Sequence, residues 1–319
     1  MTVLPVYRGV RVLVLGGTGF IGRHVARQLG LAGASLHLAA RTPDRIAESL
    51  ARLGLTGIPL QADLSRPGAG AELIRSVRPS ITFNLAGYGV DPLERDPLLA
   101  ERLNHTLVTE LAEAAGAMGS SEWPGQHLVH AGSAAEYGAA TGPLGDDTPA
   151  EPTSLYGRTK LAGTDAVGRA TGAGTLRGIP VRLFTVYGPG ERSGRLLPAL
   201  IAAAQAGRDL PLTAGEQRRD FTYVEDVAEG LLRLGLVAAP APGPVNLATG
   251  RLESVRRFAE RAATVLGLPA TRLRFGALPG RPDEMAHGEV STAGLRALCG
   301  WVPATTIEEG VRRTLQFSG

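Results

Sequence analysis

Tyr156 and Lys160 are the two residues whose types and spacing most directly suggest chemistry. Lys160 is the single lysine among 33 Lys and Arg residues, so the chain keeps a compact ammonium at one position only. Lys160 follows Tyr156 at i+4, a spacing that places two side chains on one face of a helix. A neighbouring cation favours tyrosinate, so we expect a lowered pKa for Tyr156 and a phenol that acts as general acid or base. The alternative is two ordinary surface side chains.

A glycine-rich turn near the N-terminus suggests a second function. The apolar run 11–15 leads directly into Gly16, Gly19 and Gly22, and an amphipathic pattern of helical period follows. This G-x-x-G-x-x-G spacing between a strand and a helix is typical of dinucleotide binding, because the glycines allow a tight turn and a close approach to pyrophosphate. The helix N-terminus would then face the phosphates. The alternative is a purely structural turn.

Arg41 bears on which cofactor would bind. It directly follows the apolar run 35–40, where an NAD-binding chain would carry an acidic residue for the ribose 2′-hydroxyl. Arginine instead accommodates a 2′-phosphate. We therefore predict NADP(H) as the preferred cofactor and NAD(H) as the alternative. A solvated loop arginine is the other interpretation of Arg41.

The elements that must position these residues alternate between strand-like and helix-like patterns. Such alternation predicts an α/β fold with a doubly wound parallel (Rossmann) sheet, in which ligands bind at the carboxyl ends of the strands. We assign this NAD(P)-binding domain to residues 1–180 and a smaller mixed α/β substrate domain to 181–319, with some segments returning to the sheet. The expected strands are 11–15, 35–40, 57–61, 80–85, 127–131 and 179–186, and the main helices after the first are 71–77, 96–118 and 154–171.

Composition excludes several classes of protein. The chain has 319 residues, 44% of them hydrophobic and 20% charged, which is typical of a soluble globular protein. The net charge of +3 comes without a basic run, which argues against nucleic-acid binding. Cys299 is the single cysteine and the histidines are scattered, so neither a disulfide framework nor a metal site is predicted. No apolar run reaches membrane-span length and no signal-peptide pattern is seen, so we expect a cytoplasmic protein.

Taken together, the motifs resemble the extended short-chain dehydrogenase/reductase family, in its nucleotide-sugar epimerase, dehydratase and ketoreductase branch. The resemblance covers nearly the whole chain. It is carried by GGTGFIG at 16–22, ADL at 62–64, NLAG at 84–87, SAAEYG at 133–138, YGRTK at 156–160, RLFTVYGPG at 182–190, RRDFTYVEDVA at 218–228 and the Arg281-Pro282 pair.

The resemblance implies a role for individual residues. Tyr156 would be the catalytic acid/base, Lys160 would hold the nicotinamide ribose and tune Tyr156, and Ser133 would hydrogen-bond the reacting oxygen. A nucleotide sugar would be the substrate, and the family also implies a homodimer formed through 96–118 and 154–171. The remaining cofactor-binding residues would be Gly16, Gly19, Phe20, Ile21, Gly22, Arg41, Asp63, Leu64, Leu85 and Ala86, and the remaining substrate-binding residues Thr185, Arg219 and Arg281.

Departures from the family pattern narrow the chemistry. Sugar dehydratases of this family carry an Asp-Glu pair directly after the Ser or Thr, and this chain has Ala134 and Ala135 there. Without these carboxylates the elimination of water lacks its acid and base. Thr185 replaces an Asn that contacts the substrate phosphate in many members. Glu136 is displaced by one position from the acidic pair, so we expect it to be structural.

Two chemistries use the same acid/base residues. A reductase would deliver hydride to the 4-keto group of a nucleotide-linked 4-keto-6-deoxyhexose while Tyr156 protonates the oxygen. A 4-epimerase would oxidise and re-reduce one carbon and retain its cofactor, usually NAD. Arg41 favours an exchanging NADPH and hence the reductase. A reductase of a non-nucleotide carbonyl compound and a non-catalytic cofactor-sensing protein are the more distant alternatives.

Overall fold

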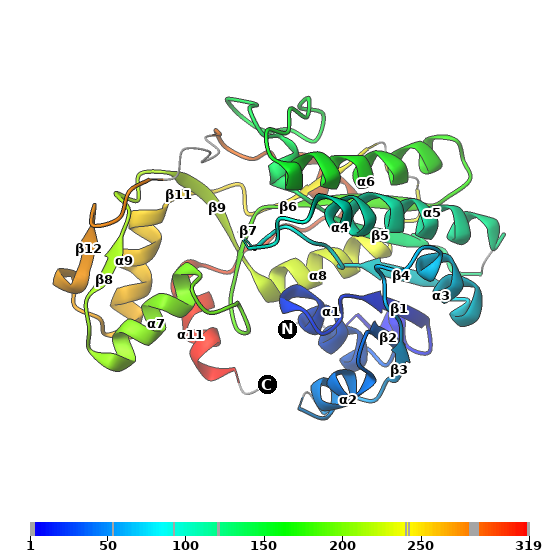
Figure 1. Cartoon of the computed structure of the whole chain (residues 1–319), viewed down its shortest axis with the longest axis horizontal. Coiled ribbons are helices and arrows are strands. Elements are labelled where there is room, and N and C mark those ends of the chain that lie inside the picture. Colours follow the sequence, from blue (N-terminus) through cyan, green and yellow to red (C-terminus); the bar gives the residue numbers. More distant parts are fainter. Residues whose placement is uncertain are drawn as a thin grey trace.

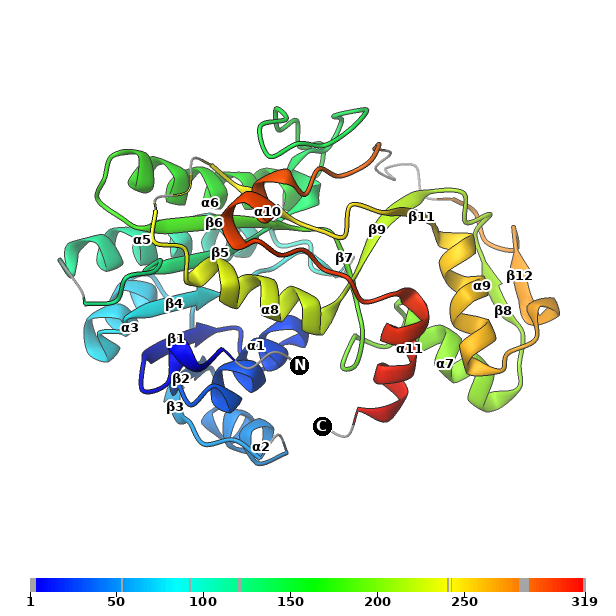
Figure 2. The same cartoon turned by 180° about the vertical axis from the view of Figure 1, so that it is seen from behind.

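The computed structural model describes residues 4–52, 54–91, 93–119, 122–239, 241, 243–280 and 287–317. Two lobes of unequal size lie side by side along the long axis of the molecule (Figure 1). The larger lobe is built on a seven-stranded sheet, and the smaller lobe contains α7, α9 and α11 with short strands. The view from behind shows the same division, with the end of the chain returning across both lobes (Figure 2).

The large sheet has the strand order β10-β6-β5-β4-β1-β2-β3, and its strands pair in parallel. The order reverses between β1 and β4, so the loops that follow these two strands diverge and leave a crevice at their carboxyl ends. The fold class predicted from the sequence is confirmed. The strands are β1 (Arg11–Leu15), β2 (Ser35–Ala40), β3 (Ile58–Gln61), β4 (Ile81–Asn84), β5 (Leu128–Ser133), β6 (Gly178–Leu183) and β10 (Val245–Leu247).

Helices cover both faces of the sheet, which is why its central strands are continuously apolar. In β1, Val12 and Val14 pack into one hydrophobic cluster, and Leu13 and Leu15 pack into the cluster on the opposite face. The first face is covered by α1 (Phe20–Leu31), α2 (Pro43–Arg52), α8 (Val224–Gly235) and α10 (Ala293–Cys299), and the second by α3 (Ala69–Val77), α4 (Pro97–Glu101), α5 (Leu107–Ala117) and α6 (Leu155–Gly172).

The predicted strand 179–186 is wrong as a single element. β6 ends at Leu183, which is the last residue to pair with both β5 and β10. Beyond it β5 has already turned away after Ser133, so the next residues take a different partner. They form β7 (Thr185–Tyr187), which pairs with β9 (Arg218–Tyr223) in a separate three-stranded sheet. The chain therefore changes sheets at Phe184.

Segments after residue 180 contribute to both lobes, because β10, α8 and α10 pack on the large sheet. The domain boundary at residue 180 stays a prediction. The elements of the smaller lobe are β7, β9, α7 (Leu196–Ala206), β8 (Leu210–Leu212), β11 (Leu252–Ser254), α9 (Val255–Leu266), β12 (Leu273–Phe275) and α11 (Ile307–Gln316). Short helical turns lie at Pro5–Tyr7, Ala134–Glu136 and Ala270–Arg272.

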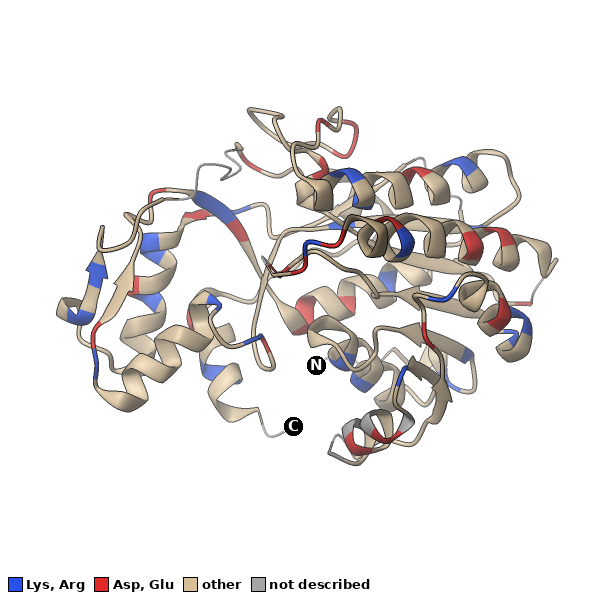
Figure 3. Cartoon of the chain, viewed as in Figure 1, with Lys and Arg blue, Asp and Glu red and all other residues tan. Residues whose placement is uncertain are grey.

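Acidic and basic residues are interspersed over both lobes in the view of Figure 3. None of the helices in the described part of the chain combines the length and the apolar character that crossing a bilayer would require. Within the same residues there is no group of three or more His, Cys, Asp or Glu side chains arranged to hold a metal ion.

Candidate active site

The first turn of α6 carries Tyr156 to the carboxyl end of β5. Ser154 caps the helix, its Oγ accepting a hydrogen bond from the Gly157 backbone N–H at 3.0 Å. A Cβ atom on Gly157 would lie 2.3 Å from the carbonyl oxygen of Ala135. Glycine is therefore required for α6 to approach the turn that follows Ser133 this closely.

The side chains of Tyr156 and Ser133 line the same cavity, and Ser133 lies close enough to act on the phenol. Burial raises the pKa of Tyr156 to about 12, against the opposing effect of the Ser133 side chain, and the negative charges of Glu136 and Glu94 raise the pKa further. The expected lowering of the Tyr156 pKa is wrong for this structure, because burial of the phenol dominates. The geometry instead holds the phenol in its protonated form, next to the hydroxyl of Ser133.

Lys160 lines the same cavity as Tyr156, with only 3% of its surface exposed. Its Nζ donates a hydrogen bond to the carbonyl oxygen of Ala131 at 2.5 Å. Burial lowers the pKa of Lys160 to about 8, and the negative charge of Glu136 opposes this shift. Among the hydrogen bonds of the described residues none joins Nζ to the Tyr156 hydroxyl. Lys160 therefore contributes a buried positive charge near the phenol rather than a direct bond to it.

Asn104 is a residue of this site that sequence reasoning missed. It lies in a π-helical segment, Arg102–Thr106, between α4 and α5, and it is fully buried. Its Nδ2 donates to the Tyr88 carbonyl at 2.8 Å and to Thr159 Oγ1 at 2.9 Å, and its Oδ1 accepts from the Tyr88 N–H at 2.9 Å. Asn104 thus fixes the loop after β4 to α6. A polar side chain within an apolar helical pattern was the available signal.

Glu136 forms a buried network directly behind Ser133. Its Oε1 accepts from the Ser133 N–H at 2.8 Å and from Thr164 Oγ1 at 3.0 Å, and its Oε2 accepts from Arg182 Nε at 2.9 Å. Glu136 is 0% exposed, and the Arg182 guanidinium also stacks on the Tyr137 ring at 4.3 Å. The carboxylate therefore holds the backbone of Ser133 and does not point into the site. Arg182 was not anticipated from the sequence.

A cavity of about 420 Å³ joins these side chains to the start of α1. One part of its wall comes from the predicted cofactor residues and another from Ser133, Tyr156 and Lys160. Charged side chains from two loops complete it. The lining includes Phe20, Ile21, Leu85, Ala86, Gly87, Val90, Asp91, Glu94, Ser133, Tyr156, Lys160, Phe184, Val186, Glu191, Arg192 and Arg195.

The glycine turn fits a dinucleotide. Gly16 has a φ of +73°, and a Cβ there would lie 2.8 Å from the Ala86 nitrogen and the Leu85 carbonyl. A Cβ on Gly22 would lie 2.0 Å from the Gly16 carbonyl oxygen. Gly19 begins α1 without a side-chain cap, so the first N–H groups of the helix lack a side-chain acceptor. These features match the needs of a pyrophosphate, and Phe20, Ile21, Leu85 and Ala86 would line the remainder of the cofactor cleft.

Arg41 lies exposed at the end of β2, close to the residues that follow β3. The Asp63 carboxylate accepts hydrogen bonds from Ser65 Oγ at 2.7 Å and the Ser65 N–H at 3.0 Å. These bonds lower the pKa of Asp63, and the positive charge of Arg41 lowers it further. Asp63 is exposed and Leu64 partly exposed, so both are accessible beside Arg41.

Two of the predicted substrate residues lie on β7 and β9. Thr185 pairs with Phe221 in the β7–β9 register, and Arg219 lies two residues before Phe221 on β9. Burial and, less strongly, the charge of Arg219 lower the pKa of His287. Neither Thr185 nor Arg219 lines the cavity described above. Arg281 lies outside the described residues.

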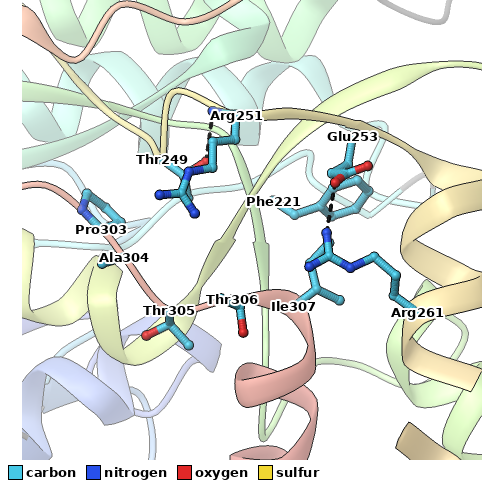
Figure 4. Close-up of a pocket in the computed structure, with 10 residues that line it drawn as sticks. All are labelled: Phe221, Thr249, Arg251, Glu253, Arg261, Pro303, Ala304, Thr305, Thr306 and Ile307. Atoms are coloured by element: carbon cyan, nitrogen blue, oxygen red, sulfur yellow. Dashed lines mark hydrogen bonds and ion pairs between the residues drawn. The ribbon is translucent and has the colours of Figure 1, made fainter. Parts of the chain in front are cut away.

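A second cavity, of about 50 Å³, lies in the smaller lobe between β9, β11 and the start of α11 (Figure 4). The Arg261 guanidinium points toward Glu253, which it contacts at 2.8 Å, and it also pairs with Glu308 at 2.6 Å. Thr249 Oγ1 is bound to the buried carboxylate of Asp220 at 2.9 Å. The charged and polar groups named here are hydrogen-bonded to one another. The cavity shares no lining residue with the larger one.

Comparison with known proteins identifies relatives along nearly the whole chain. A protein named dTDP-6-deoxy-L-talose 4-dehydrogenase (NAD(P)(+)), from Kitasatospora kifunensis, is 34% identical across 95% of this chain and 93% of its own length. A UDP-glucose 4-epimerase from Azospirillum brasilense is 28% identical across 95% of this chain and 90% of its own.

Solved structures agree with this relationship. MoeE5 in complex with UDP-glucuronic acid and NAD superposes with a TM-score of 0.79 at 27% identity, covering 96% of this chain and 98% of that one. The family model described as "NAD dependent epimerase/dehydratase family" matches residues 12–248. The resemblance inferred from the motifs is confirmed: the chain belongs to the NAD-dependent epimerase/dehydratase family of NAD(P)-dependent enzymes that act on nucleotide sugars as oxidoreductases or epimerases.

Proposed function

We propose that this enzyme is an NADPH-dependent ketoreductase that reduces the 4-keto group of a nucleotide-linked 4-keto-6-deoxyhexose. The observation that carries the proposal is that Ser133, Tyr156 and Lys160 line one cavity together with Phe20 and Ile21 at the start of the glycine-turn helix. The name of the Kitasatospora relative describes the reverse reaction, oxidation at C4 of a dTDP-linked 6-deoxyhexose. This supports dTDP as the carrier nucleotide.

The side chains divide the chemistry between them. When bound, the nicotinamide cofactor supplies the hydride that converts the ketone to an alcohol. Tyr156 holds its proton at Oη and donates it to the sugar oxygen. The Ser133 hydroxyl hydrogen-bonds the same oxygen and orients it, and Lys160 places a positive charge nearby that favours the tyrosinate left after proton transfer.

Ala134 and Ala135 argue against a dehydratase. They form the helical turn directly after Ser133, with Ala134 buried, and neither can move a proton. The acid in that turn is Glu136, whose carboxylate is bound to Ser133, Thr164 and Arg182. Elimination across two adjacent carbons would need a second acid/base pair in this position.

Arg41 supports NADPH over NADH. Its guanidinium is exposed at the tip of β2 and its charge acts on Asp63, which follows β3. A 2′-phosphate bound there would gain a bidentate partner, and a 2′-hydroxyl would gain little. For the substrate, Arg219, Arg281 and Thr185 remain our candidates for contacts to the diphosphate.

A nucleotide-sugar 4-epimerase is the second candidate, favoured by the epimerase relative and by the NAD in the MoeE5 structure. Purified enzyme mixed with NADPH and a dTDP-4-keto-6-deoxyhexose separates the two. A reductase consumes NADPH in stoichiometric amount, read as the loss of absorbance at the nicotinamide band. If the NADPH absorbance stays constant and the protein releases tightly bound NAD on denaturation, the enzyme is an epimerase and not a reductase.

A further inference from the structure

The loop that follows β4 is folded around the carboxylate of Glu94. Oε2 of Glu94 accepts hydrogen bonds from the backbone N–H groups of Gly89 at 2.7 Å and Asp91 at 3.3 Å. Two backbone donors fix one oxygen, and the carboxylate is thereby held in a single orientation. The other oxygen, Oε1, has no hydrogen-bond partner among the described residues.

This loop packs against the catalytic tyrosine. Gly89 has a φ of +100°, and a Cβ atom there would lie 3.3 Å from Cδ2 of the Tyr156 ring. Glu94 and Tyr156 line the same cavity, and the charge of Glu94 acts on the phenol. The backbone contacts therefore hold Glu94 in a loop that packs on the Tyr156 ring and lines the same cavity.

The other carboxylates of the cavity already have partners. Asp91 is paired with Arg192, and Glu191 with Arg195 at 3.4 Å. Within the described part of the chain, Glu94 is the lining carboxylate without an arginine. A partly buried carboxylate oxygen that faces a cavity is stabilised by a donor from whatever fills the cavity.

The chemistry of the substrate identifies that donor. In a 4-keto-6-deoxyhexose, the ring neighbours of C4 are C3, which carries a hydroxyl, and C5, which carries the ring oxygen and the C6 methyl. The hydroxyl nearest the reacting carbon is therefore the one on C3. Resting on the ketoreductase function proposed above, we propose that Glu94 determines specificity, its Oε1 accepting a hydrogen bond from the C3 hydroxyl of the hexose.

The test compares two substrates and three enzymes. The substrates are a dTDP-4-keto-6-deoxyhexose and its 3-deoxy counterpart, and the enzymes are the full chain, Glu94→Gln and Glu113→Gln. A glutamine at 94 can keep the bonds from Gly89 and Asp91 through its carbonyl, but it presents an amide donor in place of Oε1. Glu113 is exposed on α5, outside the cavity, and gives a matched control for loss of one carboxylate.

We expect the unmodified enzyme and Glu113→Gln to prefer the 3-hydroxy sugar by about tenfold to a hundredfold in kcat/KM, as for a hydrogen bond to a charged group. Glu94→Gln should lose most of this preference through slower turnover of the 3-hydroxy sugar alone. A preference unchanged in Glu94→Gln, or an equal loss on both sugars, would overturn the assignment. If the unmodified enzyme reduces neither sugar, the ketoreductase function itself fails, and the role of Glu94 fails with it.

Discussion

The backbone N–H of Ser133 donates a hydrogen bond at 2.8 Å to Glu136, whose other carboxylate oxygen is bound to Arg182 at 2.9 Å. The predicted catalytic hydroxyl at the end of β5 is thus connected to a buried ion pair that crosses to β6. Both members of the pair are almost fully buried, with side-chain exposures of 0% for Glu136 and 5% for Arg182. The position of Ser133 therefore depends on an ion pair that does not line the cavity.

Replacing Glu136 with Gln should destabilise the fold strongly. The change leaves the Arg182 guanidinium buried without its counter-charge, which costs about 3–5 kcal/mol. Urea denaturation measures the loss, and the double variant Glu136→Gln/Arg182→Met should recover a large part of it because no unpaired charge remains. A single variant as stable as the unmodified chain would show that the pair does not support the Ser133 segment.

Replacing Tyr156 with Phe should remove the proton donor and leave the fold intact. Since general acid catalysis contributes about 10²–10⁴-fold, kcat should fall by that factor. Steady-state kinetics measures the rate, and NADPH fluorescence titration should give an unchanged Kd. Ser133→Ala should lower kcat with the phenol still present. Full turnover by Tyr156→Phe would require another proton donor in the cavity.

Lys160 should make stability depend on pH. Burial lowers its pKa from 10.5 to about 8, so between these values the unfolded chain binds more protons than the folded chain. The free energy of unfolding should therefore rise as pH increases from about 8 to 10.5. Below pH 8 the destabilisation caused by burying the charged ammonium is fully present. Lys160→Met should raise stability at pH 7 by about 1–3 kcal/mol while abolishing activity.

Denaturant unfolding of both proteins at pH 7 and pH 10 provides the comparison. The difference in stability between them should narrow at the higher pH, because the folded protein then holds Lys160 uncharged. If the difference in unfolding free energy between the two proteins is the same at pH 7 and pH 10, burial of the Lys160 ammonium does not destabilise the fold.

Replacing Arg41 with Ala should raise KM for NADPH by about tenfold to a hundredfold, the range for a lost hydrogen bond to a charged group, and leave KM for NADH nearly unchanged. Arg75→Ala, at an exposed site on α3, is the matched control for loss of one positive charge. Initial rates with both cofactors provide the data. If KM rises by the same factor for NADPH and NADH, Arg41 does not contact the 2′-phosphate.

Much of the fold could be predicted from the sequence because its signals are local. Apolar runs such as 11–15 lie between helices on both faces of the sheet, and each ends at a turn with its own motif. The glycine turn could be predicted for the same reason, since Gly16 and Gly22 are required by backbone approaches that no larger residue allows.

The parts that sequence reasoning missed depend on contacts between distant segments. Asn104 reaches Tyr88 and Thr159 because a π-helical segment turns it inward, and Arg182 meets Glu136 across neighbouring strands. The pKa of Tyr156 followed burial rather than the nearby lysine, and the extent of burial is not contained in an i,i+4 spacing. The break between β6 and β7 depends on where neighbouring strands end, which is also a property of the assembled sheet.

That break has a mechanical consequence. Leu183 is held by the large sheet and Thr185 by the small one, so at this crossing a change in the angle between the lobes would be absorbed in the backbone around Phe184. Phe184 also forms part of the wall of the larger cavity. Such a change would therefore also alter the wall of this cavity at Phe184.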